Sequence, residues 1–289
     1  MERLSGRNYI ILGKIPAGTR VLCLGAHPDD FEGGCVNTIV NLVKSGADIT
    51  FCFTTGGEYG LPKKYTRFYG KWLRHIRAHE MRDAIRAYGL NSDGTPKIAL
   101  EWLGFIDGFV KANEVVIRKI QDLILRVQPE LIILPDPYLP IDHHSDHLRT
   151  GYACLKALRE LAHESRPKIA LGLFTRQADI FVPYKRHTDA FDMCRIHRSQ
   201  FGVYALGWGW ELVAKLLHFF TWVCHLNNWR KCGHTAEGFR LLVPPYTSPT
   251  MPTKLWHRIK RTMTKVAMTP SLEGRYDPLP EVLGLDRGY

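Results

Sequence analysis

Residues 21–30, VLCLGAHPDD, contain the pattern that decides the fold of this 289-residue chain. The apolar part of this run predicts a buried strand of a parallel sheet, followed at once by His27, Pro28, Asp29 and Asp30. Pro28 fixes its own φ and favours extended backbone at His27, so the turn is rigid. Such a turn can direct His27 and Asp30 at one point and leave Asp29 for a second task. Open α/β sheets place active sites at strand ends of this kind, although Pro and Asp are also common in plain surface turns.

Predicted strands and helices alternate after this first strand. Strands are expected at 48–55, 97–103 and 130–135, and helices at 33–46, 72–88, 113–127 and 148–161. The helix at 72–88 is expected to bury Ile76, Met81, Ala84, Ile85 and Tyr88. Later strands at 169–174 and 180–182, which antiparallel pairing would suit, and a helix at 189–200 complete the pattern.

This alternation is typical of a parallel sheet with right-handed crossovers. We therefore predict an α/β fold: a single Rossmann-like domain with a mostly parallel sheet flanked by helices, and a metal site at the C-terminal ends of the strands. The domain is expected to span residues 1–248, and residues 249–289 form a basic, proline-interrupted C-terminal extension.

A second loop rich in metal-type ligands, DHHSDH at 142–147, follows the strand at 130–135. Because parallel strands end at the same edge of a sheet, this loop can meet the turn that follows the first strand. Two imidazoles and one carboxylate with an open position form the ligand set of a catalytic zinc site. His27, Asp30 and one histidine of the second loop would satisfy that set.

A hydrolytic site of this kind also needs a base for the attacking water and an acid for the leaving group. Asp29 lies beside the predicted ligands and suits the base. His144 could serve as the cationic group, and Asp146 could orient its ring.

Together, the two loops resemble the LmbE-like, or PIG-L, family of N-acetylglucosaminyl deacetylases. The opening AHPDD signature stands at 26–30 with Glu32 as the following acidic residue, and H-x-D-H stands at 144–147 with Ser145 in place of a frequent proline. Three weaker motifs also match: R-x-x-E at 77–80, H-x-S-Q at 197–200 and A-E-x-F-R at 236–240. The resemblance runs in order from about Arg20 to Arg240.

The resemblance implies a zinc-dependent hydrolase that removes an N-acetyl group from an amino sugar of the N-acetylglucosamine type. It implies His27, Asp30 and His147 as zinc ligands and Asp29 as general base. It further implies that His144 stabilises the oxyanion or protonates the departing amine, and that Asp146 holds His144.

Other residues in or near these motifs have further expected roles. Arg77 resembles the family arginine that contacts the substrate sugar, and a helix ion pair with Glu80 is an equally good interpretation. His197 and Gln200 are expected to be structural. Asp142 stands where some relatives place a catalytic tyrosine, and the extra His143 is expected to be solvated.

The amino-acid composition narrows the class of protein and the cellular compartment in which it is expected. Hydrophobic residues make up 45% of the chain and charged residues 23%, which is ordinary for a globular protein, whereas the net charge of +11 favours anionic partners. Seven cysteines without a CxxC pair suggest reduced core thiols in a cytoplasmic protein. The apolar run at 9–12 is too short for a signal peptide, and no apolar run of about 18 residues predicts a spanning helix.

Three other classes fit the sequence less well. The second loop approaches the metallo-β-lactamase pattern H-x-H-x-D-H, but Asp142 stands where that pattern needs histidine. A dinucleotide-binding protein would carry G-x-G-x-x-G after the first strand, and this chain does not. A basic RNA-binding protein would interleave aromatic and basic residues, which occurs densely at 65–69 alone, so no nucleic-acid partner is expected.

The basic surplus suggests one hypothesis about partners. Residues 254–268, KLWHRIKRTMTKVAM, form an amphipathic basic pattern of the kind that lies on anionic membranes, and tryptophans occur in the apolar region at 207–227. A lipid-linked glycan approached from the cytoplasmic side is therefore one candidate substrate. The alternative is a terminal helix that packs on the domain, and the sequence leaves a homo-oligomer open.

Overall fold

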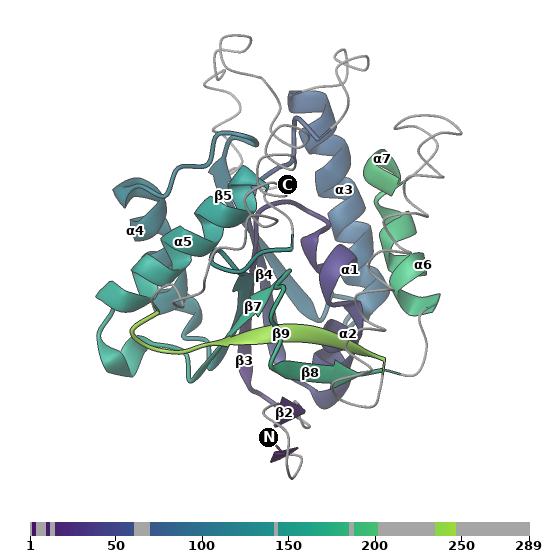
Figure 1. The fold of residues 1–289 in the computed structure, drawn as a ribbon. Coiled ribbons are helices and arrows are strands. Elements are labelled where there is room, and N and C mark those ends of the chain that lie inside the picture. Colours follow the sequence, from purple (N-terminus) through teal and green to yellow (C-terminus); the bar gives the residue numbers. More distant parts are fainter. Residues whose placement is uncertain are drawn as a thin grey trace.

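The first apolar stretch forms β3 (Arg20–Gly25), which lies inside a nine-stranded sheet in the computed structural model (Figure 1). The structure describes residues 2–3, 10–11, 15–60, 70–141, 144–184, 188–201 and 235–246. The sheet order is β1-β2-β8-β9-β7-β6-β3-β4-β5. The other strands are β1 (Glu2–Arg3), β2 (Ile10–Ile11), β4 (Asp48–Thr55), β5 (Ile98–Phe105), β6 (Leu131–Pro135), β7 (Ile169–Leu173), β8 (Ile180–Pro183) and β9 (Ala236–Leu242).

Five adjacent strands, β7, β6, β3, β4 and β5, pair in parallel. Chain order reverses between β3 and β6, which makes their shared edge the switch point of a doubly wound sheet. β9 then pairs antiparallel with both β7 and β8, so it joins the parallel core to the outer strands. The predicted Rossmann-like, mostly parallel fold is confirmed.

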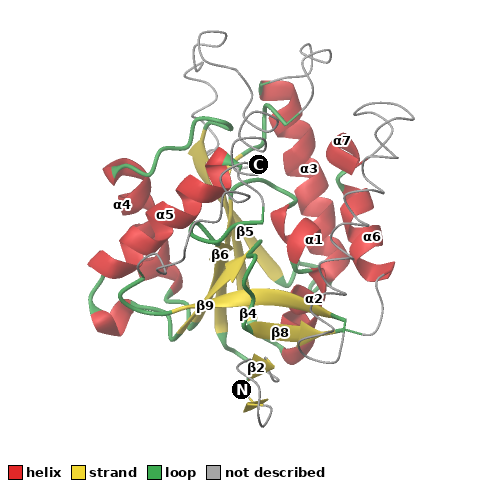
Figure 2. Ribbon diagram, in the orientation of Figure 1, coloured by secondary structure: helices red, strands yellow, loops and turns green. Residues whose placement is uncertain are grey.

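Helices cover both faces of the sheet (Figure 2). They are α1 (Asp30–Gly34), α2 (Val36–Ser45), α3 (Lys71–Tyr88), α4 (Glu114–Val127), α5 (Ser145–Glu160), α6 (Thr188–Ile196) and α7 (Arg198–Phe201). Side chains alternate along β3: Val21 and Cys23 pack in the core under α1, α2 and α3, and Leu22 and Leu24 pack in the core under α4 and α5. A parallel strand buried on both faces explains the uninterrupted apolar run of this strand.

Most predicted boundaries are confirmed within a few residues, and four details differ. The predicted helix at 189–200 is two helices, α6 and α7, which are separated at His197. The predicted helix at 33–46 is two helices, because the chain breaks at Cys35 before Gly46 ends α2 in the left-handed conformation. α5 begins at Ser145 rather than near Leu148, since His144 is its N-cap and accepts a hydrogen bond from the Asp146 amide. Ile76 was expected to be buried but is 38% exposed, because it lies one residue off the buried stripe of α3.

Several predictions fall outside the described residues: Asp142, His143, the aromatic cluster at 65–69, the apolar region at 207–227 and the extension at 249–289. None of the helices in the described ranges is long and apolar enough for a membrane crossing. The five described cysteines, Cys23, Cys35, Cys52, Cys154 and Cys194, are buried and free.

Glu237 in β9 caps a helix that lies 200 residues earlier in the chain. Its carboxylate accepts hydrogen bonds from the Asn37 and Thr38 amides, at 2.8 and 2.7 Å, and from both of their side chains. These two amides belong to the first turn of α2, where backbone N–H groups have no partner within the helix. Burial raises the pKa of Glu237, although all four donors oppose that shift.

We expect Glu237→Ala to lower the free energy of unfolding by about 2–3 kcal/mol, because it removes charge-assisted hydrogen bonds and leaves buried donors unpaired. Urea denaturation of purified protein measures this change. Glu114→Ala is the matched control, since Glu114 pairs with Lys156 at the surface and its loss should change stability little. Equal, small effects of both substitutions would contradict the capping role.

Candidate metal centre and active site

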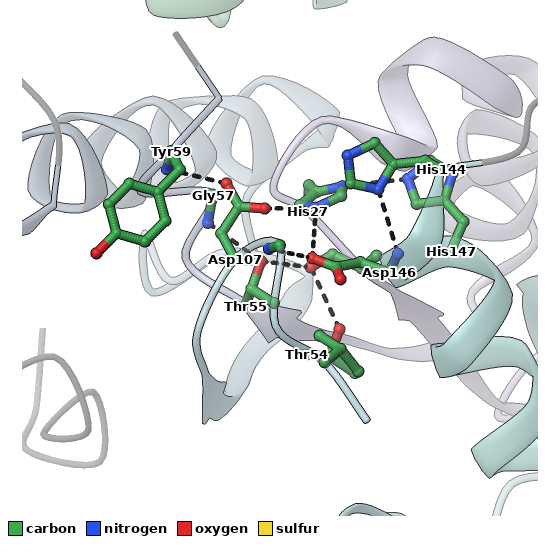
Figure 3. A network of polar contacts seen from close by, with 12 residues as sticks. His27, Thr54, Thr55, Gly57, Tyr59, Asp107, His144, Asp146 and His147 are labelled. Carbon is green, nitrogen blue, oxygen red and sulfur yellow. Dashed lines mark hydrogen bonds and ion pairs between the residues drawn. The ribbon is translucent and has the colours of Figure 1, made fainter. Parts of the chain in front are cut away.

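The two ligand-rich loops meet at the edge where β3 and β6 end (Figure 3). His27 lies two residues after β3, Asp30 begins α1, and His144 and His147 lie at the start of α5. Parallel pairing of β3 with β6 brings these loops together, although 113 or more residues separate them in sequence.

Three donor atoms converge at this edge. His27 Nδ1 lies 3.1 Å from His147 Nε2, and His147 Nε2 lies 3.1 Å from Asp30 Oδ1. The third separation, from His27 Nδ1 to Asp30 Oδ1, is 3.8 Å. Ligands about 2.0–2.1 Å from a tetrahedral zinc ion are separated by about 3.3 Å, so this triangle has the size that one ion needs. The donor set, two imidazoles and a carboxylate, also suits such an ion.

The protein fixes the orientation of two of these ligands. Asp30 Oδ2 accepts the Ala26 and His27 amides, at 2.7 and 3.2 Å, which leaves Oδ1 directed at His147. Burial would raise the pKa of Asp30, but the neighbouring His147 and His27 lower it below its usual range. The His147 ring stacks on Phe174, with ring centroids 5.4 Å apart and planes 6° from parallel.

His144 lies beside the triangle and meets His27 edge-on, with ring centroids 4.6 Å apart. Nitrogen atoms of His27, His144 and His147 lie within 4.8 Å of one another, so His144 is a second candidate partner for a metal held by the other two. Burial, together with the charges of His27 and His147, lowers the pKa of His144 to about 4.

Asp29, the neighbour of Asp30 in the chain, pairs with Arg77. Arg77 Nη2 donates to Asp29 Oδ1 at 2.8 Å and to the Pro28 carbonyl, and Nη1 donates to the Gly57 carbonyl. The Asp29 side chain is 16% exposed and the Arg77 side chain 3%. Burial raises the pKa of Asp29, although Arg77 opposes this.

Glu80, the other candidate partner of Arg77, is bound to the H-x-S-Q segment instead. It accepts hydrogen bonds from the Ser199 amide at 2.7 Å and from the Ser199 hydroxyl at 2.6 Å. His197 is fully buried, and its Nε2 lies 3.3 Å from Glu32 Oε2. The segment thus contacts both α3, through Glu80, and α1, through Glu32. These two helices carry Arg77 and Asp30.

Asp107, which was not identified from the sequence, contacts His27 on the side of the ring away from His147. Its Oδ1 is 3.0 Å from His27 Nε2, and its Oδ2 accepts the Tyr59 amide at 2.9 Å. Burial would lower the pKa of His27, but Asp107, Asp146 and Asp30 raise it to about 10. Asp107 follows β5, so the strand-end rule used for the two loops could have identified it.

Asp146 also faces His27. One of its oxygens accepts the Gly108 amide at 2.6 Å and lies 3.4 Å from His27 Nε2. Its link to His144 runs through the backbone, because the Asp146 amide donates to His144 Nδ1 at 3.3 Å. His27, Asp107 and Asp146 thus form a second group of potential metal ligands, fully buried.

The histidines and aspartates at the switch point of this α/β domain could hold a metal ion, as in metal-dependent hydrolases. Comparison with known proteins identifies the family. The family model PIG-L (GlcNAc-PI de-N-acetylase) matches residues 22–158. A probable N-acetyl-α-D-glucosaminyl L-malate deacetylase of Bacillus cereus is 30% identical over 162 residues, which cover 55% of this chain and 70% of the relative. The chain belongs to the PIG-L family.

Two further relatives cover more of the chain. Diacetylchitobiose deacetylase of Thermococcus kodakarensis is 28% identical over 241 residues, which cover 77% of this chain and 83% of the relative. The solved structure of the N,N'-diacetylchitobiose deacetylase of Pyrococcus horikoshii covers 80% of this chain and 87% of its own, with a TM-score of 0.66 and 24% identity. That last similarity supports the fold.

We expect Asp30→Ala and His147→Ala to lower bound divalent metal at least tenfold, because each removes one of three converging donors. Metal content after dialysis, measured by inductively coupled plasma mass spectrometry, tests this. Arg77→Ala is the control: it removes a buried charge beside the centre but no donor of the triangle. Full metal occupancy in Asp30→Ala would contradict the ligand assignment.

Proposed function

We propose that this chain is a zinc-dependent hydrolase that removes the acetyl group from an amino sugar of the N-acetylglucosamine type. The observation that carries the proposal is the donor triangle of His27, Asp30 and His147 with a carboxylate, Asp29, beside it. Membership of the PIG-L family supports the reaction, because the relatives named above are deacetylases of N-acetylated sugars.

Zinc is the metal that this donor set suits best, since two imidazoles and one carboxylate with an open position are typical of its catalytic sites. When bound, it would acidify a water molecule and polarise the acetyl carbonyl. The chain's own residues would perform the remaining steps.

Asp29 is the proposed general base. It would take a proton from the water whose oxygen attacks the acetyl carbonyl carbon, and Arg77 at 2.8 Å would hold its carboxylate in place. The C–N bond then breaks, the amine nitrogen gains a proton, and acetate and a free amino sugar leave. A direct contact of Arg77 with the sugar stays a prediction.

His144 is proposed to act at the carbonyl oxygen or the departing nitrogen. Because its Nδ1 accepts the Asp146 amide, the neutral ring carries its proton on Nε2, where it can donate to either atom. Asp146 would thus orient His144 through its backbone N–H.

We expect Asp29→Asn to keep its zinc and lose turnover by about 10²–10⁴-fold, the usual contribution of a general base. Acetate release and metal content, measured on the same preparation, test the two halves of this expectation. Asp48→Asn, at the exposed start of β4, is the control and should retain normal turnover. If Asp29→Asn keeps more than a tenth of the wild-type rate, another group takes the proton.

The proposed substrate class is tested by acetate release from a panel of free, disaccharide and lipid-linked N-acetylglucosaminides. Release from at least one soluble member supports the amino-sugar assignment, and release from the lipid-linked members alone supports a membrane-borne substrate. Zinc-loaded protein that releases no acetate from any of them would overturn the amino-sugar assignment.

A further inference from the structure

His27 offers two ring nitrogens, and the structure uses them differently. Nδ1 faces His147 at 3.1 Å and Asp30 at 3.8 Å. Nε2 faces Asp107 at 3.0 Å and Asp146 at 3.4 Å (Figure 3). An imidazole that binds a metal through one nitrogen keeps a proton on the other nitrogen only, so whichever group fixes that proton also decides which nitrogen can bind a metal.

A backbone amide fixes the carboxylate of Asp107 in place. It is 4% exposed, and its Oδ2 accepts the Tyr59 amide at 2.9 Å. Its own amide donates to Glu58 Oε1 at 3.1 Å, which ties the loop after β5 to the loop after β4. Asp146 likewise accepts the Gly108 amide. Since both carboxylates already accept amide protons, they fit a donor at His27 Nε2 better than a second cation.

We infer that Asp107 is a positioning residue that keeps the proton of His27 on Nε2 and its Nδ1 directed at the metal. This inference rests on the proposed function, because it assumes a metal at His27. Asp107 is the primary partner rather than Asp146, since its oxygen is the closer of the two to Nε2. A carboxylate behind a ligating histidine also raises the basicity of the ligand.

Asp107→Asn tests the inference. Asparagine has one acceptor oxygen, and the His27 Nε2–H and the Tyr59 N–H would compete for it. Zinc affinity, measured by competition with a chelator, should fall about 10–100-fold, the usual cost of losing such a partner. The visible absorption spectrum of the Co²⁺-substituted protein should also change, because the geometry at His27 changes.

Asp136→Asn is the matched control. Asp136 is also a buried aspartate that follows a central strand, but its carboxylate binds Arg240 and Thr175. We expect this variant to lose thermal stability and keep wild-type zinc affinity. If Asp107→Asn binds zinc as tightly as wild type, or if both variants lose affinity in proportion to stability, the inference is overturned while the proposed function stands. A wild-type chain that binds no zinc overturns both.

A different surface of the molecule carries a second, independent inference. His75 and His79 are exposed and lie one turn apart on α3, whereas Arg77 between them is buried. Their Nε2 atoms are 3.2 Å apart and their ring centroids 4.7 Å. Two ligands of one transition-metal ion at about 2.0–2.1 Å are about 2.9–3.4 Å apart, so the pair is already spaced for shared coordination.

We propose that His75 and His79 form a surface site for a borderline transition-metal ion. Two imidazoles without a thiolate suit Cu²⁺ and Ni²⁺, and both fit tetragonal nitrogen and oxygen coordination. Helical geometry brings the two rings together, because residues four apart are neighbours on a helix surface, and the rings share a hydrogen bond. The site does not depend on the catalytic centre.

Calorimetric titration of zinc-loaded, untagged protein with Ni²⁺ tests this second site. His75→Ala and His79→Ala should each weaken Ni²⁺ binding at least tenfold. His163→Ala, which removes an exposed histidine elsewhere, should leave it unchanged. Retained binding in both single variants, or a wild-type chain that binds no Ni²⁺ once its zinc site is filled, would overturn the site.

Discussion

The parallel pairing of β3 with β6 is the constraint on which the rest of the structure depends. These strands are adjacent in the sheet although chain order places two other strands between them. Adjacent parallel strands end at the same edge of the sheet. The loops that follow them therefore either diverge to opposite faces or come together around a common site. Here they share one, because His27 and Asp30 follow the first strand and His147 follows the second.

The chemistry at this edge is a concentration of buried negative charge around imidazole rings. Asp30, Asp107 and Asp146 are all buried and surround His27. The protein reduces the cost of burying each carboxylate by directing backbone amides at it, those of Ala26, Tyr59 and Gly108 respectively. A divalent cation would balance most of the remaining charge, which is the electrostatic reason why this edge suits a metal.

The sequence predicted the parallel part of the sheet and the meeting of the two loops, because both follow from periodicity and from the rule for parallel strand ends. It predicted no strand at 236–242, where β9 lies. The strand-end rule could have placed Asp107 at this edge, but it could not have predicted the contact of Asp107 with His27 Nε2, since that contact depends on the path of the loop after β5. The sequence also left two interpretations of Arg77, and the structure directs its guanidinium at Asp29 rather than at Glu80. Long-range packing decides between these interpretations. Ser199 of α7 donates two hydrogen bonds to Glu80, and no local sequence pattern relates α7 to α3.

Glu237 and Arg240, both in β9, contact parts of the fold that are synthesised much earlier. One caps α2, and the other forms a paired ion bridge, 2.6 Å at each contact, with Asp136 at the end of β6. Both partners precede them by 100 residues or more and flank the strands that carry the ligands. During synthesis, both halves of the proposed metal centre are therefore made long before β9. A nascent chain that ends before β9 would contain every proposed zinc ligand. It would lack the strand whose side chains cap α2 and pair with Asp136 after β6.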